Sequence, residues 1–298
     1  MSGPRSLLFV PGNREDMLGK APRSGADALI LDLEDSVPVA EKARARDIAH
    51  DYIGLNGSRH VLYVRVNAIS TGWLEADLEA IVRPGLAAVR LAMTDSAATV
   101  REVDRLIGER EARAGMPPGS VRICPSLETA RGVWNAHEIC AASPRVNAVS
   151  CGTAQDGDLQ ADLGYQWSPE GTEVLYVRSR VLLAAKAAGV AHVLDGTYAR
   201  IRDEDGLRQC CETVRRLGYR GKSCIHPAQV PVVNGIFMPT ARELDYYRRV
   251  IEAFDAAVAR GSAATTVDGT MVDYAMVDTA RRVMAWAESA ARGGRGHE

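Results

Sequence analysis

Short apolar runs rich in valine, isoleucine and leucine recur along the chain, and segments with helical periodicity lie between them. The runs read SLLFVPG, ALILDLED, HVLYVRVN, AVRLAM, VRICPSLE, VNAVSCGT, AHVLDGTY and KSCIHP. Such runs are typical of parallel strands buried on both faces, and their alternation with helices indicates repeated βα units. About eight such units predict an α/β fold, a closed (β/α)8 TIM barrel.

Nearly every run ends in, or is soon followed by, a polar residue that an apolar core would not accommodate. These residues are Glu34, Asp35, Arg65, Asn67, Glu128, Asp158, Asp195 and His226. In a barrel of parallel strands the carboxyl ends of all strands open onto one face, where catalytic groups normally lie. The fold therefore predicts that these scattered side chains gather around one cavity.

Capping residues indicate where several helices begin. Thr129 and Asp203 each precede a segment with helical periodicity, so both are predicted N-caps. Ser168 is followed by Pro169 and an acidic residue, which predicts the start of a further helix that ends at Gly189.

The pattern changes after KSCIHP. We predict a helix from about residue 241 to 259, then a weakly periodic segment rich in Gly, Ala and Thr, and a last helix from about 272 to 290. This tail follows the eighth strand, so it is not needed to close the barrel. The chain is therefore divided into a TIM-barrel catalytic domain, 1–240, and a C-terminal helical extension, 241–298. The extension is expected to be a lid, an oligomer contact or a packing appendage.

Composition narrows the class of protein. The net charge of −2 gives no reason to expect a nucleic-acid or anionic-membrane partner. No secretory signal is evident, and no apolar stretch approaches the roughly 20 residues that span a bilayer. The six cysteines include no C-x-x-C pair, and several lie in strand patterns, which favours free thiols. We expect a soluble, cytoplasmic protein.

Two of the strand-end residues are carboxylates that suit a metal ion. If Glu128 and Asp158 face one cavity, their repulsion is costly unless a cation or a proton offsets it. Oxygen ligands favour a hard cation such as Mg²⁺, whose remaining positions are filled by substrate and water. Asp156 lies in the same loop and is a rival to Asp158. The alternative is that Glu128 lies in a first helical turn and Asp158 caps a turn.

Three further polar residues are candidates for the site. Arg65 and Asn67 are two positions apart, so they are predicted to share one face of a strand. Arg65 suits a substrate carboxylate or carbonyl, but it equally suits an ion pair with one of the acids that end the second run. His226 precedes a proline, so it is a candidate base or ligand, or a residue that shapes a turn.

Several stretches together resemble a known family, the citrate lyase β-subunit-like (CitE-like) proteins. The wider group contains malyl-CoA lyases and related aldolases, the HpcH/HpaI aldolase group. The stretches are RSLLFVPGNRE, GADALILDLEDSV, VRVN, SLETARGVWNAHEI, GDLQADLG, GKSCIHPAQV and GTMVDYAMV, and the resemblance extends from residue 5 to about 285. It implies a TIM barrel, Mg²⁺, and acyl-CoA or acyl-carrier-protein substrates. It also implies a homotrimer or homohexamer in which the tail reaches a neighbouring subunit.

The resemblance also implies roles for individual residues. Glu128 and Asp158 match the family's magnesium ligands. Arg65 matches the arginine that binds substrate oxygens, and Asp273 in GTMVD matches the acid/base aspartate of the C-terminal lid.

Other matches concern substrate binding and support of the site. The Pro11-Gly12 turn and the segment containing His226 match regions that line the acyl-CoA cleft. Glu34 and Asp35 match an acidic pair near the metal, with a supporting role.

The chain departs from the family pattern at two places. Many relatives end the fourth strand in Pro-Lys, where this chain has Ala92-Met93. Relatives also have a shorter Glu-Asp loop before the second ligand, where this chain has residues 155–158, Gln-Asp-Gly-Asp. The choice between Asp156 and Asp158 therefore stays open, and so does the identity of the substrate.

The reaction that the resemblance implies is Mg²⁺-dependent carbon–carbon cleavage or formation of a β-hydroxyacyl thioester. Malyl-, citramalyl- or citryl-CoA would give acetyl-CoA or a similar thioester and an α-keto acid. Two alternatives remain: a malyl-CoA-type thioesterase, and a non-catalytic paralogue that binds CoA or a protein partner. The sequence does not choose among the acids, because a single methyl group changes binding by only about 1–3 kcal/mol.

Overall fold

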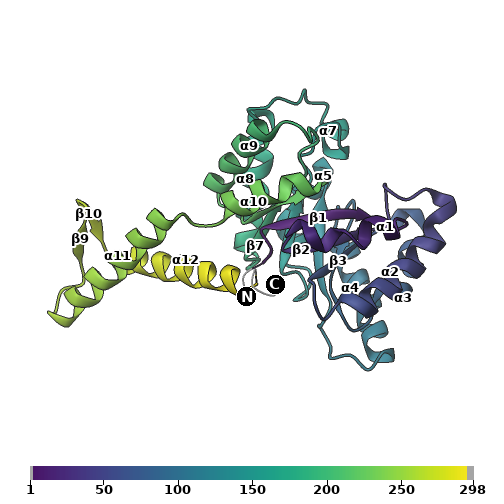
Figure 1. Cartoon of the computed structure of the whole chain (residues 1–298), viewed down its shortest axis with the longest axis horizontal. Coiled ribbons are helices and arrows are strands. Elements are labelled where there is room, and N and C mark those ends of the chain that lie inside the picture. The colour runs from purple at the N-terminus through teal and green to yellow at the C-terminus, as the bar shows by residue number, and fades with distance from the viewer. Residues whose placement is uncertain (1–2, 294–298) are drawn as a thin grey trace. The chain divides into compact units, whose positions relative to one another are not determined.

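Eight parallel strands close into a barrel in sequence order (Figure 1). The structure is a computed structural model that describes residues 3–293. The barrel strands are β1 Ser6–Pro11, β2 Ala28–Asp32, β3 Leu62–Val66, β4 Leu86–Leu91, β5 Arg122–Leu127, β6 Ala148–Cys151, β7 His192–Asp195 and β8 Gly221–Cys224. The predicted (β/α)8 barrel is confirmed.

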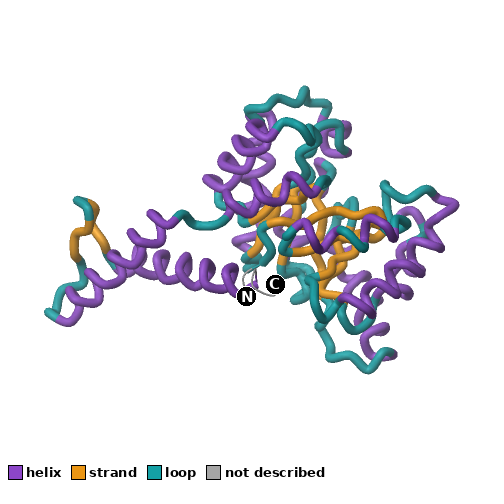
Figure 2. Tube along the Cα trace, in the orientation of Figure 1, coloured by secondary structure: helices purple, strands orange, loops and turns teal. Residues whose placement is uncertain are grey.

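Helices surround this barrel (Figure 2). They are α1 Glu15–Leu18, α2 Lys42–Asn56, α3 Leu74–Ile81, α4 Ala97–Arg113, α5 Ala130–Trp134, α6 Ala136–Cys140, α7 Asp158–Leu163, α8 Leu175–Ala187, α9 Glu204–Leu217 and α10 Val230–Phe237. Short 3-10 turns cover Ala21–Ser24, Val39–Glu41, Ile69–Thr71, Thr172–Val174 and Pro227–Gln229. Among the described residues, no helix is apolar over a length that would cross a bilayer.

The strands bury side chains on both of their faces. Outward-facing residues such as Leu31, Val64 and Val89 pack against the helices in one large core. Inward-facing residues form a separate apolar layer inside the barrel, made of Leu7, Ala28, Ile30, Tyr63, Ala88, Cys124, Ala148 and Leu194. Because this layer fills the barrel interior towards the amino ends of the strands, only the end at the carboxyl ends of the strands is left for a site.

Both predicted N-caps at the starts of α5 and α9 are confirmed. The Thr129 hydroxyl accepts a hydrogen bond from the Gly132 amide at 3.0 Å. The Asp203 carboxylate accepts one from the Gly206 amide at 2.9 Å. In each case the side chain satisfies an amide that has no partner within the helix.

The predicted start of α8 is wrong. The helix begins at Leu175 and not beside Ser168, and a 3-10 turn precedes it. The Ser168 amide and hydroxyl both donate to the Glu173 carboxylate, at 2.8 Å each. These bonds hold Ser168 in a loop, so the Ser-Pro-Glu signal marks a turn here.

The chain forms two compact units. The barrel unit is Gly3–Phe237, and the second unit begins at Met238. It contains α11 Ala241–Ala259, the antiparallel hairpin of β9 Thr265–Val267 and β10 Thr270–Val272, and α12 Tyr274–Gly293. Its small core includes Val250, Phe254 and Val272. The hairpin was not predicted, although its Asp268-Gly269 turn, with φ of 50° and 77°, is a strong hairpin signal.

Candidate active site

A cavity of about 460 Å³ opens at the carboxyl ends of the barrel strands. Each strand, or the loop that follows it, contributes to the lining; in chain order these residues include Pro11, Asp32, Arg65, Arg90, Glu128, Gly152, Gly196 and Ile225. The barrel thus brings together residues that lie far apart in the sequence, as its topology predicts.

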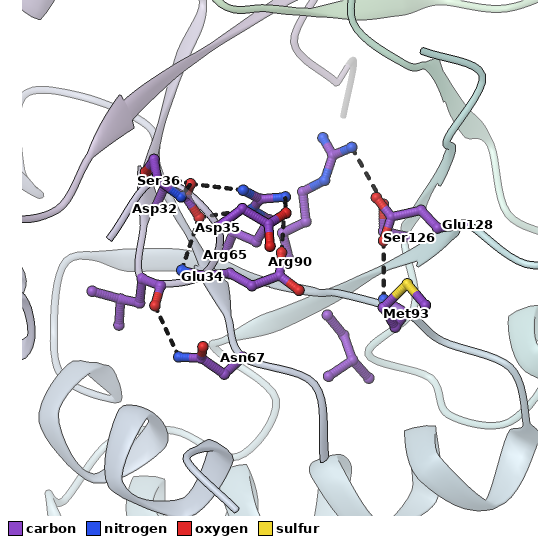
Figure 3. Close-up of polar contacts among 12 residues, drawn as sticks. Asp32, Glu34, Asp35, Ser36, Arg65, Asn67, Arg90, Met93, Ser126 and Glu128 are labelled. Atoms are coloured by element: carbon purple, nitrogen blue, oxygen red, sulfur yellow. Dashed lines mark hydrogen bonds and ion pairs between the residues drawn. The ribbon is translucent and has the colours of Figure 1, made fainter. Parts of the chain in front are cut away.

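Glu128 is held at the wall of this cavity by two hydrogen bonds (Figure 3). Its Oε1 accepts from the Ser126 hydroxyl and its Oε2 from the Met93 amide, each at 3.0 Å. Met93 has a φ of 48°, a left-handed conformation that is unusual for a side chain of this size. At Gly152 a Cβ would lie 2.5 Å from the Glu128 Cγ, so this glycine leaves the space that the carboxylate side chain occupies.

Asp158, at the start of α7, lines the same cavity. Burial and repulsion from Glu128 and Asp35 raise its pKa. Asp156 and Asp158 are both exposed, but Asp156 does not contribute to the cavity lining, and its amide donates to the Gln160 side chain at 2.8 Å. Asp158 and Glu128 therefore line one cavity, and Asp156 does not.

Arg65 also lines the cavity, and three carboxylates surround it (Figure 3). Its Nε and Nη2 donate to the two oxygens of Asp32, at 2.7 Å each. Its Nη1 lies 2.8 Å from Glu34 and 3.2 Å from Asp35. The guanidinium stacks on Phe9 at 5.0 Å. Arg65 thus forms the ion pairs with Glu34 and Asp35 that the sequence allowed, and a stronger bidentate pair that was not anticipated.

Burial dominates the titration of the acids around Arg65. Burial raises the pKa of Glu34 to about 8, and repulsion from Asp35 and Glu128 adds to this against the attraction of Arg65. Burial also opposes ionisation of Asp32, but its hydrogen bonds from Arg65 hold its pKa below the ordinary value. Asp32 is therefore an ionised carboxylate whose charge is balanced by Arg65, whereas the other acids around the cavity repel each other.

The lining residues include more carboxylates than guanidinium groups, which suits a bound cation. Asp32, Asp35, Glu128 and Asp158 face only two guanidinium groups, those of Arg65 and Arg90. Neither Glu128 nor Asp158 forms an ion pair within residues 3–293. That part of the chain also holds no cluster of three or more metal-ligating side chains. Two carboxylates that leave most positions to substrate and water are the set that Mg²⁺ tolerates well, so the residues present fit this ion.

The turn after β1 lies close to β2. Pro11 lines the cavity, and the Gly12 amide donates to the Asp32 carbonyl at 2.8 Å. A Cβ at position 12 would lie 2.7 Å from that carbonyl oxygen, so a glycine is required there.

Four of the polar residues near strand ends do not line the cavity, and Glu34 is one of them, although it contacts Arg65. Asn67 follows the end of β3, and its amide donates to the Leu33 carbonyl at 2.9 Å and to Asp77 at 2.7 Å. The prediction that Asn67 shares a face with Arg65 is therefore wrong, because the strand ends at Val66.

The other two are Asp195 and His226. Asp195 is fully buried and pairs with Arg178 at 3.0 Å and with Lys222 at 2.5 Å. His226 is exposed, and its Nδ1 accepts from the Ala228 amide at 3.2 Å, so it shapes the turn after β8. Its neighbour in the chain, and not His226 itself, lines the cavity.

Asp273 belongs to the second unit. It lies between β10 and α12, and its carboxylate accepts a hydrogen bond from the Met276 amide at 3.1 Å. This bond caps α12. The acid/base role of Asp273 therefore rests on the resemblance described above.

Sequence reasoning missed Asp32 and Arg90 as residues of the site. Both lie within apolar runs, whereas the residues predicted for the site lie at or after the ends of such runs. The signal that could have found Arg90 is the one applied to Arg65: an arginine inside an apolar strand needs a partner.

The sequence matches one family over most of its length. The family described as HpcH/HpaI aldolase/citrate lyase matches residues 5–227. Citrate lyase subunit beta of Escherichia coli strain K12 is 38% identical over 290 residues, covering 95% of this chain and 93% of that protein. The (3S)-malyl-CoA thioesterase of Cereibacter sphaeroides strain KD131 is 37% identical over 288 residues, covering 96% and 95%. These names include both a lyase subunit and a thioesterase.

Solved structures have the same fold. CitE from Mycobacterium tuberculosis, in complex with magnesium, acetoacetate and coenzyme A, has a TM-score of 0.74 and 33% identity, covering 96% of this chain and 98% of that chain. A citrate lyase beta subunit from the same organism, with oxaloacetate and magnesium, has a TM-score of 0.64 and 34% identity, covering 80% and 98%.

Proposed function

Because the chain belongs to the HpcH/HpaI aldolase/citrate lyase family, we propose that it is a Mg²⁺-dependent carbon–carbon lyase of β-hydroxyacyl thioesters. Cleavage would give acetyl-CoA or a similar thioester and an α-keto acid. The observation that carries the proposal is that Glu128 and Asp158, two unpaired carboxylates, line one cavity with Arg65 at the carboxyl end of the barrel.

In this proposal Glu128 and Asp158 hold the ion. When bound, Mg²⁺ would stabilise negative charge on the substrate oxygen that is the hydroxyl oxygen of the β-hydroxyacyl thioester and the carbonyl oxygen of the keto acid. The bonds from Ser126 and Met93 fix the Glu128 carboxylate before substrate arrives, so little reorganisation is needed.

Arg65 supplies a second, fixed positive charge. Its bidentate pair with Asp32 and its contacts with Glu34 and Asp35 leave it few free donors, so its role is electrostatic and its orientation is set by these acids. Buried charges act strongly in a cavity from which water is largely excluded.

Asp273 is assigned the proton transfer. In the cleavage direction it gives a proton to the methylene carbon of the thioester enolate, which becomes the methyl group of acetyl-CoA; in condensation it takes that proton back. The resemblance supports this role and the delivery of Asp273 to a neighbouring subunit of a homotrimer or homohexamer.

If Asp273 is delivered to a neighbouring subunit, mixing inactive Glu128→Gln and Asp273→Ala chains restores part of the activity, because some mixed sites are complete. Two inactive variants that stay inactive after subunit exchange would contradict delivery between subunits.

A thioesterase is the second candidate, because a relative of similar identity bears that name. The same cavity would then direct water to the thioester carbonyl. The products distinguish the two reactions: a short acyl-CoA plus a keto acid means cleavage, and free CoA plus the intact hydroxy acid means hydrolysis. An acyl-CoA that binds without turnover would instead indicate a binding protein.

The test is a panel of malyl-, citramalyl- and citryl-CoA, with Mg²⁺ and then with EDTA. Free thiol and keto acid are both measured. We expect keto acid without free thiol for at least one substrate, and its loss in EDTA. Keto-acid production that persists in EDTA would contradict the proposed mechanism.

A further inference from the structure

Arg90 in β4 is a buried cation that lines the cavity and has no carboxylate partner. It is 3% exposed, and no ion pair to it occurs within residues 3–293. Its Nη1 donates to the Ser223 hydroxyl at 2.8 Å, and its Nη2 to the hydroxyls of Ser150 at 2.6 Å and Ser126 at 3.4 Å. Its Nε is buried and has no hydrogen-bond partner.

Arg90 and its serines form the floor of the cavity. The serines belong to β5, β6 and β8, so the guanidinium reaches across the barrel interior. Two positions before Arg90, Ser126 and Ser150, in β4, β5 and β6, lie Ala88, Cys124 and Ala148, which belong to the apolar layer below. Two positions later than Ser126 lies Glu128. Arg90 is therefore one layer deeper than the proposed metal ligands.

A charge in this position is costly. Burial lowers the pKa of Arg90, and the more distant carboxylates of Glu128 and Asp32 offset this only in part. The groups in hydrogen-bond contact with the guanidinium are serine hydroxyls, which offer only dipoles. Arg65, by contrast, has three carboxylates around it. Both guanidinium groups stack on Phe9, at 5.0 and 5.1 Å, so they share one cavity and differ in their charge partners. Arg90 is the cation in the cavity that is left for an anion from outside the chain.

We propose that Arg90 binds a second carboxylate on the keto-acid half of the substrate and thereby selects thioesters whose cleavage yields a dicarboxylic keto acid. The proposal rests on the proposed lyase function and deepens it. The carboxylate next to the reacting carbon lies at the level of Glu128 and Asp158, and a second carboxylate further along the acid reaches the floor. Citryl-type thioesters carry it on a carboxymethyl group, whereas malyl and citramalyl types have a hydrogen atom or a methyl group in place of that carboxymethyl group.

The experiment compares two acids with the same four-carbon skeleton, oxaloacetate and 2-oxobutyrate. They differ in that a carboxylate of the first is a methyl group in the second. Each is titrated calorimetrically, with Mg²⁺ present, into the wild-type protein. We expect oxaloacetate to bind about 10- to 100-fold more tightly, the range of a charge-assisted hydrogen bond in a buried site.

Arg90→Gln is expected to remove this preference by weakening oxaloacetate alone, with 2-oxobutyrate binding within about threefold of the wild type. Arg90→Lys keeps the charge without the planar fork, so it retains part of the preference, and it replaces Arg90→Gln if thermal unfolding shows that the latter is unfolded. Arg110→Gln is the matched control, because Arg110 is a nearly buried arginine of α4 that lies outside the cavity lining; both affinities stay unchanged.

Two results would overturn the assignment: equal affinity of the wild type for both acids, or an equal loss for both acids in the Arg90 variants, which is what a structural cross-link predicts. The result is separable from the proposed function. If the wild type binds the two acids with the expected preference but cleaves no thioester, the proposed lyase function is contradicted and the proposed role of Arg90 stands. Thioester cleavage without the preference defeats the role of Arg90 alone.

Discussion

Two ionic clusters, one on each side of the barrel wall, show how similar residues take different roles. The outer cluster consists of Asp195, Arg178 and Lys222, and each charge has an opposite charge within 3.0 Å. The inner cluster surrounds Arg65 and contains more carboxylates than cations; its acids are Asp32, Glu34, Asp35, Glu128 and Asp158. The outer cluster is closed among strands and helices, and the inner cluster faces a cavity. An excess of one charge beside open volume calls for a ligand, and a satisfied buried pair does not.

The largest effect is expected when the outer cluster is broken. Asp195→Asn leaves Arg178 and Lys222 without a compensating charge and should lower the free energy of unfolding by about 3–5 kcal/mol. Urea unfolding measures this loss. Activity per folded molecule should be kept, because none of the three residues lines the cavity. A stable Asp195→Asn protein with no activity would instead give the outer cluster a catalytic role.

Glu128→Gln is expected to have the opposite profile. It removes a proposed metal ligand and should lower the rate of thioester cleavage by at least about 100-fold, as loss of a group that acts in the transition state does. Stability should change little, because relief of repulsion among the acids of the inner cluster offsets the one hydrogen bond that the amide nitrogen of glutamine cannot accept. Steady-state kinetics and urea unfolding on the same preparation provide the two readouts. A Glu128→Gln variant that is destabilised but still active would show that Glu128 stabilises the fold, as the outer cluster does, and is not needed for cleavage.

Gly152→Ala tests the position of Glu128 without changing any charge. The new Cβ would lie 2.5 Å from the Glu128 Cγ, so the side chain must shift. A displacement of this kind should lower the rate about 10- to 100-fold. The control is Gly235→Ala in α10, where a Cβ meets nothing within 4 Å, and it should leave the rate unchanged. Equal rates for both variants would show that Glu128 tolerates movement.

The barrel was predictable because its strands are continuous apolar runs separated by helical segments. The inner and outer clusters were not distinguishable, because strands buried on both faces lack the apolar–polar alternation that reveals which side faces inwards. Leu194 lies in the inner layer, so Asp195 points outwards, but nothing in the run AHVLDGTY shows this phase.

The candidate site was predictable in part. The run ends pointed to Glu128, Asp158 and Arg65, and the barrel brings all three to the cavity. Arg90 and the bidentate partner of Arg65 were missed, because they lie inside runs and their significance depends on contacts from distant strands. The resemblance supplied Asp273, which no local pattern identifies.

The central claim is that Glu128 and Asp158 together hold one divalent ion. Its most direct test is a calorimetric titration of Mg²⁺ into the wild type and into Glu128→Gln, Asp158→Asn and Asp156→Asn. Asp156→Asn is the matched control, since this neighbouring aspartate is as exposed as Asp158 but does not contribute to the cavity lining. We predict one site per chain in the wild type and in Asp156→Asn, and its loss in the other two variants. Unchanged Mg²⁺ binding in Glu128→Gln and Asp158→Asn would contradict the account.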